Sequence, residues 1–245
     1  MITLALLALL TVTPVQDDSY LYKVTLIRAA PGHLLDVMEA YRERIPFYDA
    51  AGEPRPSMIR HSQGDHWDLM VIEPVQSLPA YYAADRVARR VAAGESVGMT
   101  PHEFEARLQE IASWKEETFF SSVQLEEFRR RFDNSGYFHV EMFVALAGKG
   151  QELYRQREME NEYLRRIGRP QNLIFAKALG GPWDSFTLGF YRDLQHYAES
   201  VDIPSELEQE AAIAAGFEGA DKIGTYMRTL IARHNDTLGG KVALW

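Results

Sequence analysis

Hydrophobic and polar residues alternate along two segments that begin 116 positions apart, residues 21–28 and 137–144. Both segments are rich in β-forming residues, which is the pattern of a strand. Apolar residues then recur at helical spacing: Leu34, Leu35, Val37, Met38, Tyr41 and Ile45 after the first segment, and Leu153, Tyr154, Tyr163 and Leu164 after the second. The sequence therefore predicts a strand followed by an amphipathic helix, twice.

Gly-x-Pro breaks end both predicted helices, at Gly52 and Gly168. Each break is followed by a hairpin pattern, a second helical pattern and a closing β-like stretch. In the two copies the hairpin turns lie at 63–65 and 179–181, the second helices begin near 78 and 194, and the closing strands span 118–125 and 242–245. Each copy thus has the order strand, helix, strand, strand, helix, strand.

An internal duplication relates the two halves of the chain. A shift of 116 positions aligns residues 20–85 with 136–201 without a gap, and near the end the shift becomes 119. Identities include Gly32 with Gly148, Gly52 with Gly168, Pro54 with Pro170, Gly64 with Gly180, Trp67 with Trp183, Asp68 with Asp184, and Tyr81 with Tyr197; the later shift pairs Glu117 with Asp236 and Thr118 with Thr237. Glycines at equivalent loops and a repeated Trp-Asp pair favour duplication over chance.

The element order predicts an α+β fold of two tandem ferredoxin-like (βαββαβ) repeats. Each repeat has helices on one sheet face only, so the bare faces can pack face to face as an intrachain pseudo-dimeric α+β barrel. With its duplication and Trp-Asp strand starts, the chain resembles the dimeric α+β barrel superfamily. This group includes antibiotic-biosynthesis monooxygenase-like, NIPSNAP-like, chlorite dismutase and coproheme decarboxylase proteins, and no motif selects one of them.

The predicted boundaries are repeat 1 at 19–126, a linker at 127–135 and repeat 2 at 136–245. Residues 1–16 resemble a signal peptide, because an apolar run is followed by a polar sequence; a buried N-terminal helix is the alternative. Export predicts a periplasmic or secreted protein with no stable membrane anchor in its mature form, and otherwise a cytoplasmic one. The chain has no Cys, which excludes disulfides and thiol chemistry.

Charge limits the partners. Lys and Arg total 26 against 35 Asp and Glu, and a net charge of -9 argues against nucleic-acid binding. The basic runs at 86–90 and 129–131 are interleaved with apolar residues, as on a solvated helix face. We therefore expect a small-molecule ligand as the partner, with homo-oligomerisation left open.

The first strand of each repeat supplies the candidate chemistry. One side is apolar (Tyr22, Val24 and Leu26; Phe138, Val140 and Met142), and we expect it to face the helices. The other side is mixed (Lys23, Thr25 and Ile27; His139, Glu141 and Phe143), and we expect it to line a cavity between the repeats.

In that cavity His139, Glu141 and Lys23 are the predicted catalytic residues. His139 could act as a base near neutral pH, with Glu141 orienting a donor and Lys23 stabilising an enolate or carboxylate. Thr25, Ile27 and Phe143 would contact the ligand. The alternative is structural: Lys23 and Glu141 pair across the interface to fix its register.

Residues just before the last strand form a second candidate. Arg233 and His234 belong to repeat 2 alone and are predicted ligand contacts, whereas Asp236 and Glu117 are predicted to cap or hold turns. Three further pairs are predicted to be structural: His61 and His66 as exposed turn histidines, Trp67 and Trp183 as core residues, and Asp68 and Asp184 as turn residues.

No metal site and no cofactor are predicted, because no third ligand stands at suitable spacing from His61 and His66. Haem stays an alternative through the resemblance, which implies a proximal His on a helix of repeat 2, where His196 alone lies in a helical region. The favoured hypothesis is an oxygenase-, isomerase- or decarboxylase-like enzyme acting without a cofactor on a small, partly apolar compound. A non-catalytic ligand- or haem-binding protein and a structural module are the alternatives.

Overall fold

The computed structural model describes residues 19–244, so the predicted signal peptide lies outside the described residues. Repeat 1 comprises β1 (Tyr20–Ala29), α1 (Leu34–Glu43), α2 (Ile45–Ala51), β2 (Ser57–Gln63), β3 (Leu69–Gln76), α3 (Leu78–Tyr81), α4 (Ala84–Val97), α5 (Pro101–Ile111) and β4 (Ala112–Ser122). Helix α6 (Leu125–Asp133) occupies most of the predicted linker.

Repeat 2 comprises β5 (Tyr137–Ala145), α7 (Gly150–Arg166), β6 (Leu173–Gly180), β7 (Ser185–Tyr191), α8 (Leu194–Ala198), a 3-10 turn (Glu199–Asp202), α9 (Ser205–Ala214), a second 3-10 turn (Ala220–Lys222), α10 (Ile223–Arg228) and β8 (Ile231–Lys241). The order of the strands and principal helices is that of repeat 1. Within residues 19–244, no helix has the length and apolar character needed to cross a membrane.

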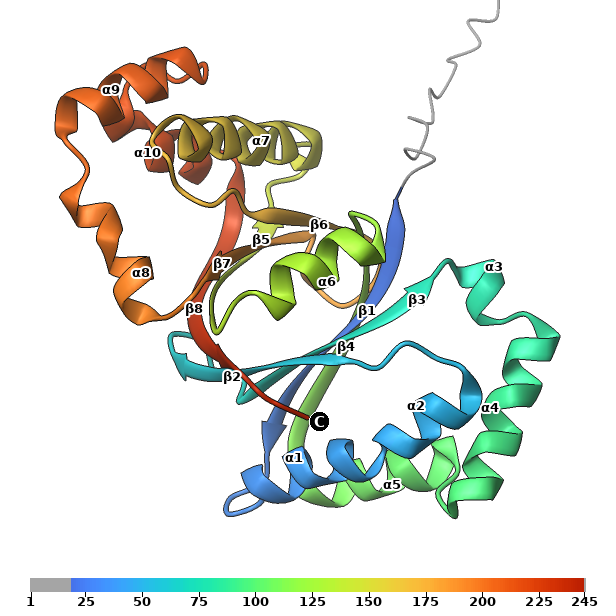
Figure 1. The fold of residues 1–245 in the computed structure, drawn as a ribbon. Coiled ribbons are helices and arrows are strands. Elements are labelled where there is room, and N and C mark those ends of the chain that lie inside the picture. Colours follow the sequence, from blue (N-terminus) through green and yellow to red (C-terminus); the bar gives the residue numbers. More distant parts are fainter. Residues whose placement is uncertain (1–18, 245) are drawn as a thin grey trace, which may run out of the picture.

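The strands form a closed antiparallel barrel in the order β1-β3-β2-β8-β5-β7-β6-β4 (Figure 1). Each repeat contributes one four-stranded sheet, and the sheets join where β2 pairs with β8 and where β4 pairs with β6. Thr25 of β1 lies opposite Glu117 of β4, as Glu141 of β5 lies opposite Asp236 of β8. The predicted α+β barrel of tandem ferredoxin-like repeats is therefore confirmed.

The barrel interior is filled by apolar side chains from both sheets. A single buried cluster contains Tyr22, Val24, Leu26, Phe120, Phe138, Val140, Met142, Phe175 and Phe186. Stacked and edge-on aromatic contacts bind it together, including Phe175 on Phe186 with ring centroids 4.2 Å apart. Helix α6 adds Phe128 and Phe132 to the same cluster.

The predicted orientation of the first strands was wrong. Tyr22 and Phe138 point into the barrel, whereas the mixed side faces outward to the helices: Ile27 packs with Val37 of α1, and Phe143 with Leu153 of α7. Both strand faces are covered, so burial alone does not distinguish them. The face that is apolar in both strands is the one that packs against the opposite sheet and against Phe128 and Phe132 of α6.

The closing strands begin earlier than predicted, at Ala112 and Ile231, and β8 ends at Lys241, so the strand predicted at 242–245 was placed too late in the chain. Their first halves carry charged residues that concealed the strand pattern. Glu117 and Asp236 consequently lie within strands, and their prediction as turn or cap residues was wrong.

The repeated Trp-Asp pairs have the predicted structural roles. Trp67 and Trp183 are buried in the barrel cluster. Asp68 accepts a hydrogen bond from the Ala29 backbone N–H at 2.8 Å, and Asp184 accepts one from Ala145 at 2.9 Å. Each carboxylate therefore ties the start of a hairpin strand to the end of the first strand of its repeat.

Candidate functional sites between sheet and helices

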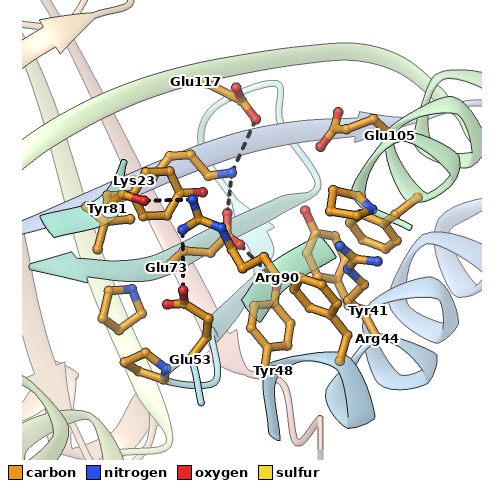
Figure 2. A pocket seen from close by; sticks show the side chains of 16 residues that line it. Lys23, Tyr41, Arg44, Tyr48, Glu53, Glu73, Tyr81, Arg90, Glu105 and Glu117 are labelled. Carbon is orange, nitrogen blue, oxygen red and sulfur yellow. Dashed lines mark hydrogen bonds and ion pairs between the residues drawn. The ribbon is translucent and has the colours of Figure 1, made fainter. Parts of the chain in front are cut away.

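In repeat 1 a cavity of about 440 Å³ lies between the outer face of the sheet and the helices (Figure 2). Strands β1, β3 and β4 supply Lys23, Glu73 and Glu117 to it. Helices and loops supply the remaining walls, which include Tyr41, Arg44, Phe47, Tyr48, Tyr81, Arg90, Phe104 and Glu105. The cavity is of the size and mixed character of small-ligand sites.

Lys23 is the central charge of this cavity. Its Nζ lies 2.7 Å from Glu73 and 3.8 Å from Glu117, and the Tyr48 hydroxyl donates to Glu73 at 2.9 Å (Figure 2). Burial alone would lower the pKa of Lys23, but the carboxylates outweigh burial and hold it above its ordinary value. For Glu73, burial would raise the pKa, and Lys23 outweighs this and lowers it. The ammonium is therefore fixed and charged.

Arginines and phenols frame the cavity. Arg44 donates to the Met99 carbonyl at 2.8 Å and lies 3.7 Å from the Phe47 ring centre, while Arg90 donates to the Tyr81 carbonyl at 2.6 Å. Both guanidinium groups are thus committed to structure. Burial raises the pKa of Tyr81, so its hydroxyl stays protonated and able to donate.

A second cavity, of about 430 Å³, occupies the equivalent place in repeat 2. His139 and Glu141 of β5, Asp236 of β8 and Tyr197 line it, together with Gln63 and Gly64 from the hairpin of repeat 1. His139 Nε2 lies 3.0 Å from Asp236 Oδ1.

The buried charges of this second cavity form a network. Burial alone would lower the pKa of His139, but Asp236 and Glu141 outweigh it and raise that pKa. Glu141 sits against Arg157, and although burial opposes it, the surrounding positive groups lower its pKa. Glu160, on the far side of Arg157, has its pKa raised, chiefly by burial.

The two cavities are related by the duplication. Lys23, Tyr81 and Glu117 in repeat 1 correspond to His139, Tyr197 and Asp236 in repeat 2. Equivalent positions of the two cavities therefore hold an ammonium group in repeat 1 and an imidazole in repeat 2. Tyr81 and Tyr197 were missed as site residues, although their identity across the duplication was a signal for them.

The predicted catalytic residues do not share one site. His139 and Glu141 lie together in repeat 2, whereas Lys23 lies in the cavity of repeat 1. The predicted cavity between the repeats is wrong, because the facing sheets enclose a filled apolar core. The alternative pair of Lys23 with Glu141 is also wrong: Lys23 binds Glu73, and Glu141 binds Arg157.

The other predicted contacts are spread over both repeats. Thr25 and Ile27 are fully buried on the outer face of β1. Phe143 stacks on His234 with ring centres 4.9 Å apart, and Arg233, on the opposite face of β8, lies over Trp183. Of the turn histidines, His66 is exposed as predicted, but His61 lies in β2 with a buried Nε2.

Haem does not fit the histidine that the resemblance implies. His196 lies in α8, and its Nδ1 accepts a hydrogen bond from the Arg192 backbone N–H at 3.2 Å. Its Nε2 lies 4.0 Å from Glu199. Both nitrogens face groups of its own segment, so we derive no step through haem.

No family model and no curated protein matches the chain. Among solved structures, an anthrone oxidase-like protein superposes with a TM-score of 0.60 at 12% identity over 93% of each chain. A candidate monooxygenase from Fusobacterium nucleatum superposes at 0.53 with 10% identity, over 93% of this chain and 94% of that one. A candidate chlorite dismutase superposes at 0.51 with 13% identity, over 92% and 96%. These likenesses support the α+β barrel architecture across nearly the whole chain and leave the family within it unresolved.

Proposed function

We propose that the chain is an enzyme that binds a small, partly apolar carbonyl compound in the cavity of repeat 1 and stabilises its enolate. The proposal rests on one observation: a buried ammonium, Lys23, stands between two carboxylates in a cavity of about 440 Å³ with aromatic walls. Such a fixed charge is already oriented for an oxyanion before the reaction begins.

The roles follow from the charge states. Lys23 stays protonated and offers its charge to the carbonyl oxygen, with the Tyr81 hydroxyl as a second donor. Glu117 is the carboxylate that would take the proton, because it is 38% exposed and its contacts with Lys23 at 3.8 Å and Lys115 at 3.4 Å are longer than the 2.7 Å contact of Glu73 with Lys23. Oxygenases, isomerases and decarboxylases that work without a cofactor can share this enolate step.

An oxygenase is favoured among these because two of the superposed proteins are described as anthrone oxidase-like and as a candidate monooxygenase. In that reaction the deprotonated carbon of an anthrone gives electrons to dioxygen, and quinone and water are the products. We also propose that the chain is exported, on the apolar run at residues 2–15. N-terminal sequencing of the mature protein tests this, and an intact Met1 contradicts it.

Anthrone is the first substrate to test, with dioxygen uptake and quinone absorbance as readouts. Lys23→Met combined with Glu73→Leu removes the charge without leaving its partner buried alone, and we expect at least a 100-fold loss of kcat/KM. Asp85→Asn, on the exposed face of α4, is the control and should keep full activity. Unchanged turnover in the folded double variant would exclude the cavity of repeat 1 as the active site.

A further inference from the structure

Two short motifs meet on the outer face of repeat 2. His139-x-Glu141 lies on β5 and His234-x-Asp236 on β8, and the register places Glu141 directly opposite Asp236. Because alternate residues of a strand share a face, the four side chains project to the same side of the sheet. The histidines then flank the central carboxylate pair, one at each end.

The donor atoms converge. The ligand atoms of His139, Glu141 and Asp236 all lie within 4.8 Å of one another. His139 Nε2 is 3.0 Å from Asp236 Oδ1, and His234 Nε2 is 3.5 Å from Asp236 Oδ1 and 3.6 Å from Glu141 Oε1. Metal–ligand bonds of about 2.1 Å separate neighbouring donors by roughly 3.0–3.4 Å, so these spacings approach the edges of a coordination polyhedron.

His234 gives an independent indication. Its Nε2 is buried and lies 3.6 Å from Glu141 Oε1 and 3.5 Å from Asp236 Oδ1, so it is paired with both carboxylates at distances longer than those of a usual hydrogen bond. Carboxylates only accept, so Nε2 must carry either a proton or a metal ion for this contact to be favourable. A cation between these atoms would satisfy all of them.

Glu141 is held for such a role by groups outside the cluster. Thr187 donates to its Oε2 at 2.9 Å, and Arg157 Nη1 approaches the same oxygen at 3.3 Å. Oε1 is turned toward His234. Partners of this kind orient the ligands of metal sites.

Repeat 1 shows how the same positions are neutralised without a metal. Lys23 and Lys115 stand where repeat 2 has His139 and His234, and their ammonium groups lie 3.8 Å and 3.4 Å from Glu117. Repeat 2 has two carboxylates at the equivalent place and imidazoles instead of lysines. Arg157 supplies one positive charge to Glu141, and a metal ion would supply the charge that neutral imidazoles, unlike the lysines of repeat 1, do not.

We propose that repeat 2 binds a divalent transition-metal ion such as Zn²⁺ through His139, Glu141 and Asp236, with His234 as the fourth ligand. Imidazole and carboxylate donors suit zinc and its first-row neighbours. The cavity of about 430 Å³ beside His139, Glu141 and Asp236 gives the ion an entry path. This site is separate from the proposed active site in repeat 1.

The test uses the full chain after treatment with a chelator. Titration with Co²⁺, followed by its visible absorption, and with Zn²⁺, followed by calorimetry, should each give one ion per chain. Asp236→Asn and His139→Gln should weaken binding at least about 100-fold, because loss of an outer partner alone costs 10- to 100-fold. Thr187→Val should weaken it by about 10-fold.

The duplication supplies the matched variants. His139→Lys with His234→Lys copies repeat 1 into repeat 2, so we expect a folded protein without the site, whereas Lys115→Met in repeat 1 should bind the ion as the unmodified chain does. Circular dichroism verifies folding. Absence of saturable binding in the unmodified chain, or equal affinity in folded Asp236→Asn and His139→Gln variants, would overturn the proposal.

Discussion

Glu73 shows how a single side chain determines the character of the cavity in repeat 1. It holds Lys23 at 2.7 Å and accepts from Tyr48, with 17% of its side chain exposed. Neither charge could stay there alone, because a buried ion without its partner is strongly unfavourable. The pair therefore fixes the charge at the centre of a cavity whose walls also carry Arg44, Arg90 and Glu105.

Removing one charge of the Lys23–Glu73 pair should lower the stability of the protein strongly, whereas replacing both residues with apolar ones should lower it little. We expect Glu73→Gln to lower the free energy of unfolding by about 3 kcal/mol, whereas Lys23→Met with Glu73→Leu restores most of the loss. Urea unfolding measures both. Equal destabilisation of the single and double variants would show that shape, and not charge, matters at this site.

The same pair predicts a pH dependence. The pKa of Glu73 is lowered in the folded protein, so its contribution is complete above the unfolded-state pKa of about 4.3 and is lost as pH falls further. The pKa of Lys23 is raised, so its contribution is complete below about pH 10.4 and is lost above it.

We therefore expect the stability difference between the unmodified chain and the double variant to be constant near neutrality. Below about pH 4.3 the unmodified chain should lose stability relative to the double variant, because the unfolded carboxylate takes up a proton more readily than the folded one. Urea midpoints of both proteins across this range measure it. An unmodified chain that gains stability relative to the double variant on acidification would contradict the assignment.

At the level of elements, the Trp-Asp pairs connect each hairpin to the first strand of its repeat. Asp68 and Asp184 accept from equivalent backbone N–H groups, so Asp68→Ala and Asp184→Ala should each destabilise by about 1–3 kcal/mol by leaving a donor unpaired. Because the two tethers lie in different repeats, their effects should add. Thermal unfolding of both single variants and the double variant checks this.

Periodicity predicted the element order, and the duplication predicted how the elements are repeated. Periodicity could not show which face of β1 or β5 points into the barrel, because apolar residues are buried on both faces: Tyr22 and Ile27 are equally buried on opposite faces of β1. Of the cluster in repeat 2, the sequence predicted His139 with Glu141 and, separately, His234 as a ligand contact, whereas Asp236 was predicted to be a turn or cap residue. His139-x-Glu141 and His234-x-Asp236 are 95 residues apart, and only the β5–β8 register brings them together.

On the scale of the whole molecule, the hairpin of each repeat packs against the closing strand of the other repeat, and Gln63 and Gly64 of the first hairpin help to line the cavity of repeat 2. Gly64, in the hairpin of repeat 1, packs against β8. A Cβ added to it would lie 2.0 Å from the Asp236 carbonyl oxygen. The hairpin of repeat 2 places Gly180 on β4, with the equivalent distance to Glu117 being 2.9 Å. Both glycines have positive φ, which favours glycine at these contacts.

The packing of the repeat 1 hairpin against β8 predicts that a backbone contact controls ion binding at the proposed metal site. Gly64→Ala must push β8 away at Asp236, so we expect lower stability and at least tenfold weaker Zn²⁺ binding, although no ligand is altered. Gly148→Ala is the control: it has a similar positive φ of 78° in open space, so it carries only the cost of that conformation, about 1–2 kcal/mol, and should keep its Zn²⁺ affinity. If both variants bind Zn²⁺ as the unmodified chain does, the hairpin of repeat 1 does not position Asp236.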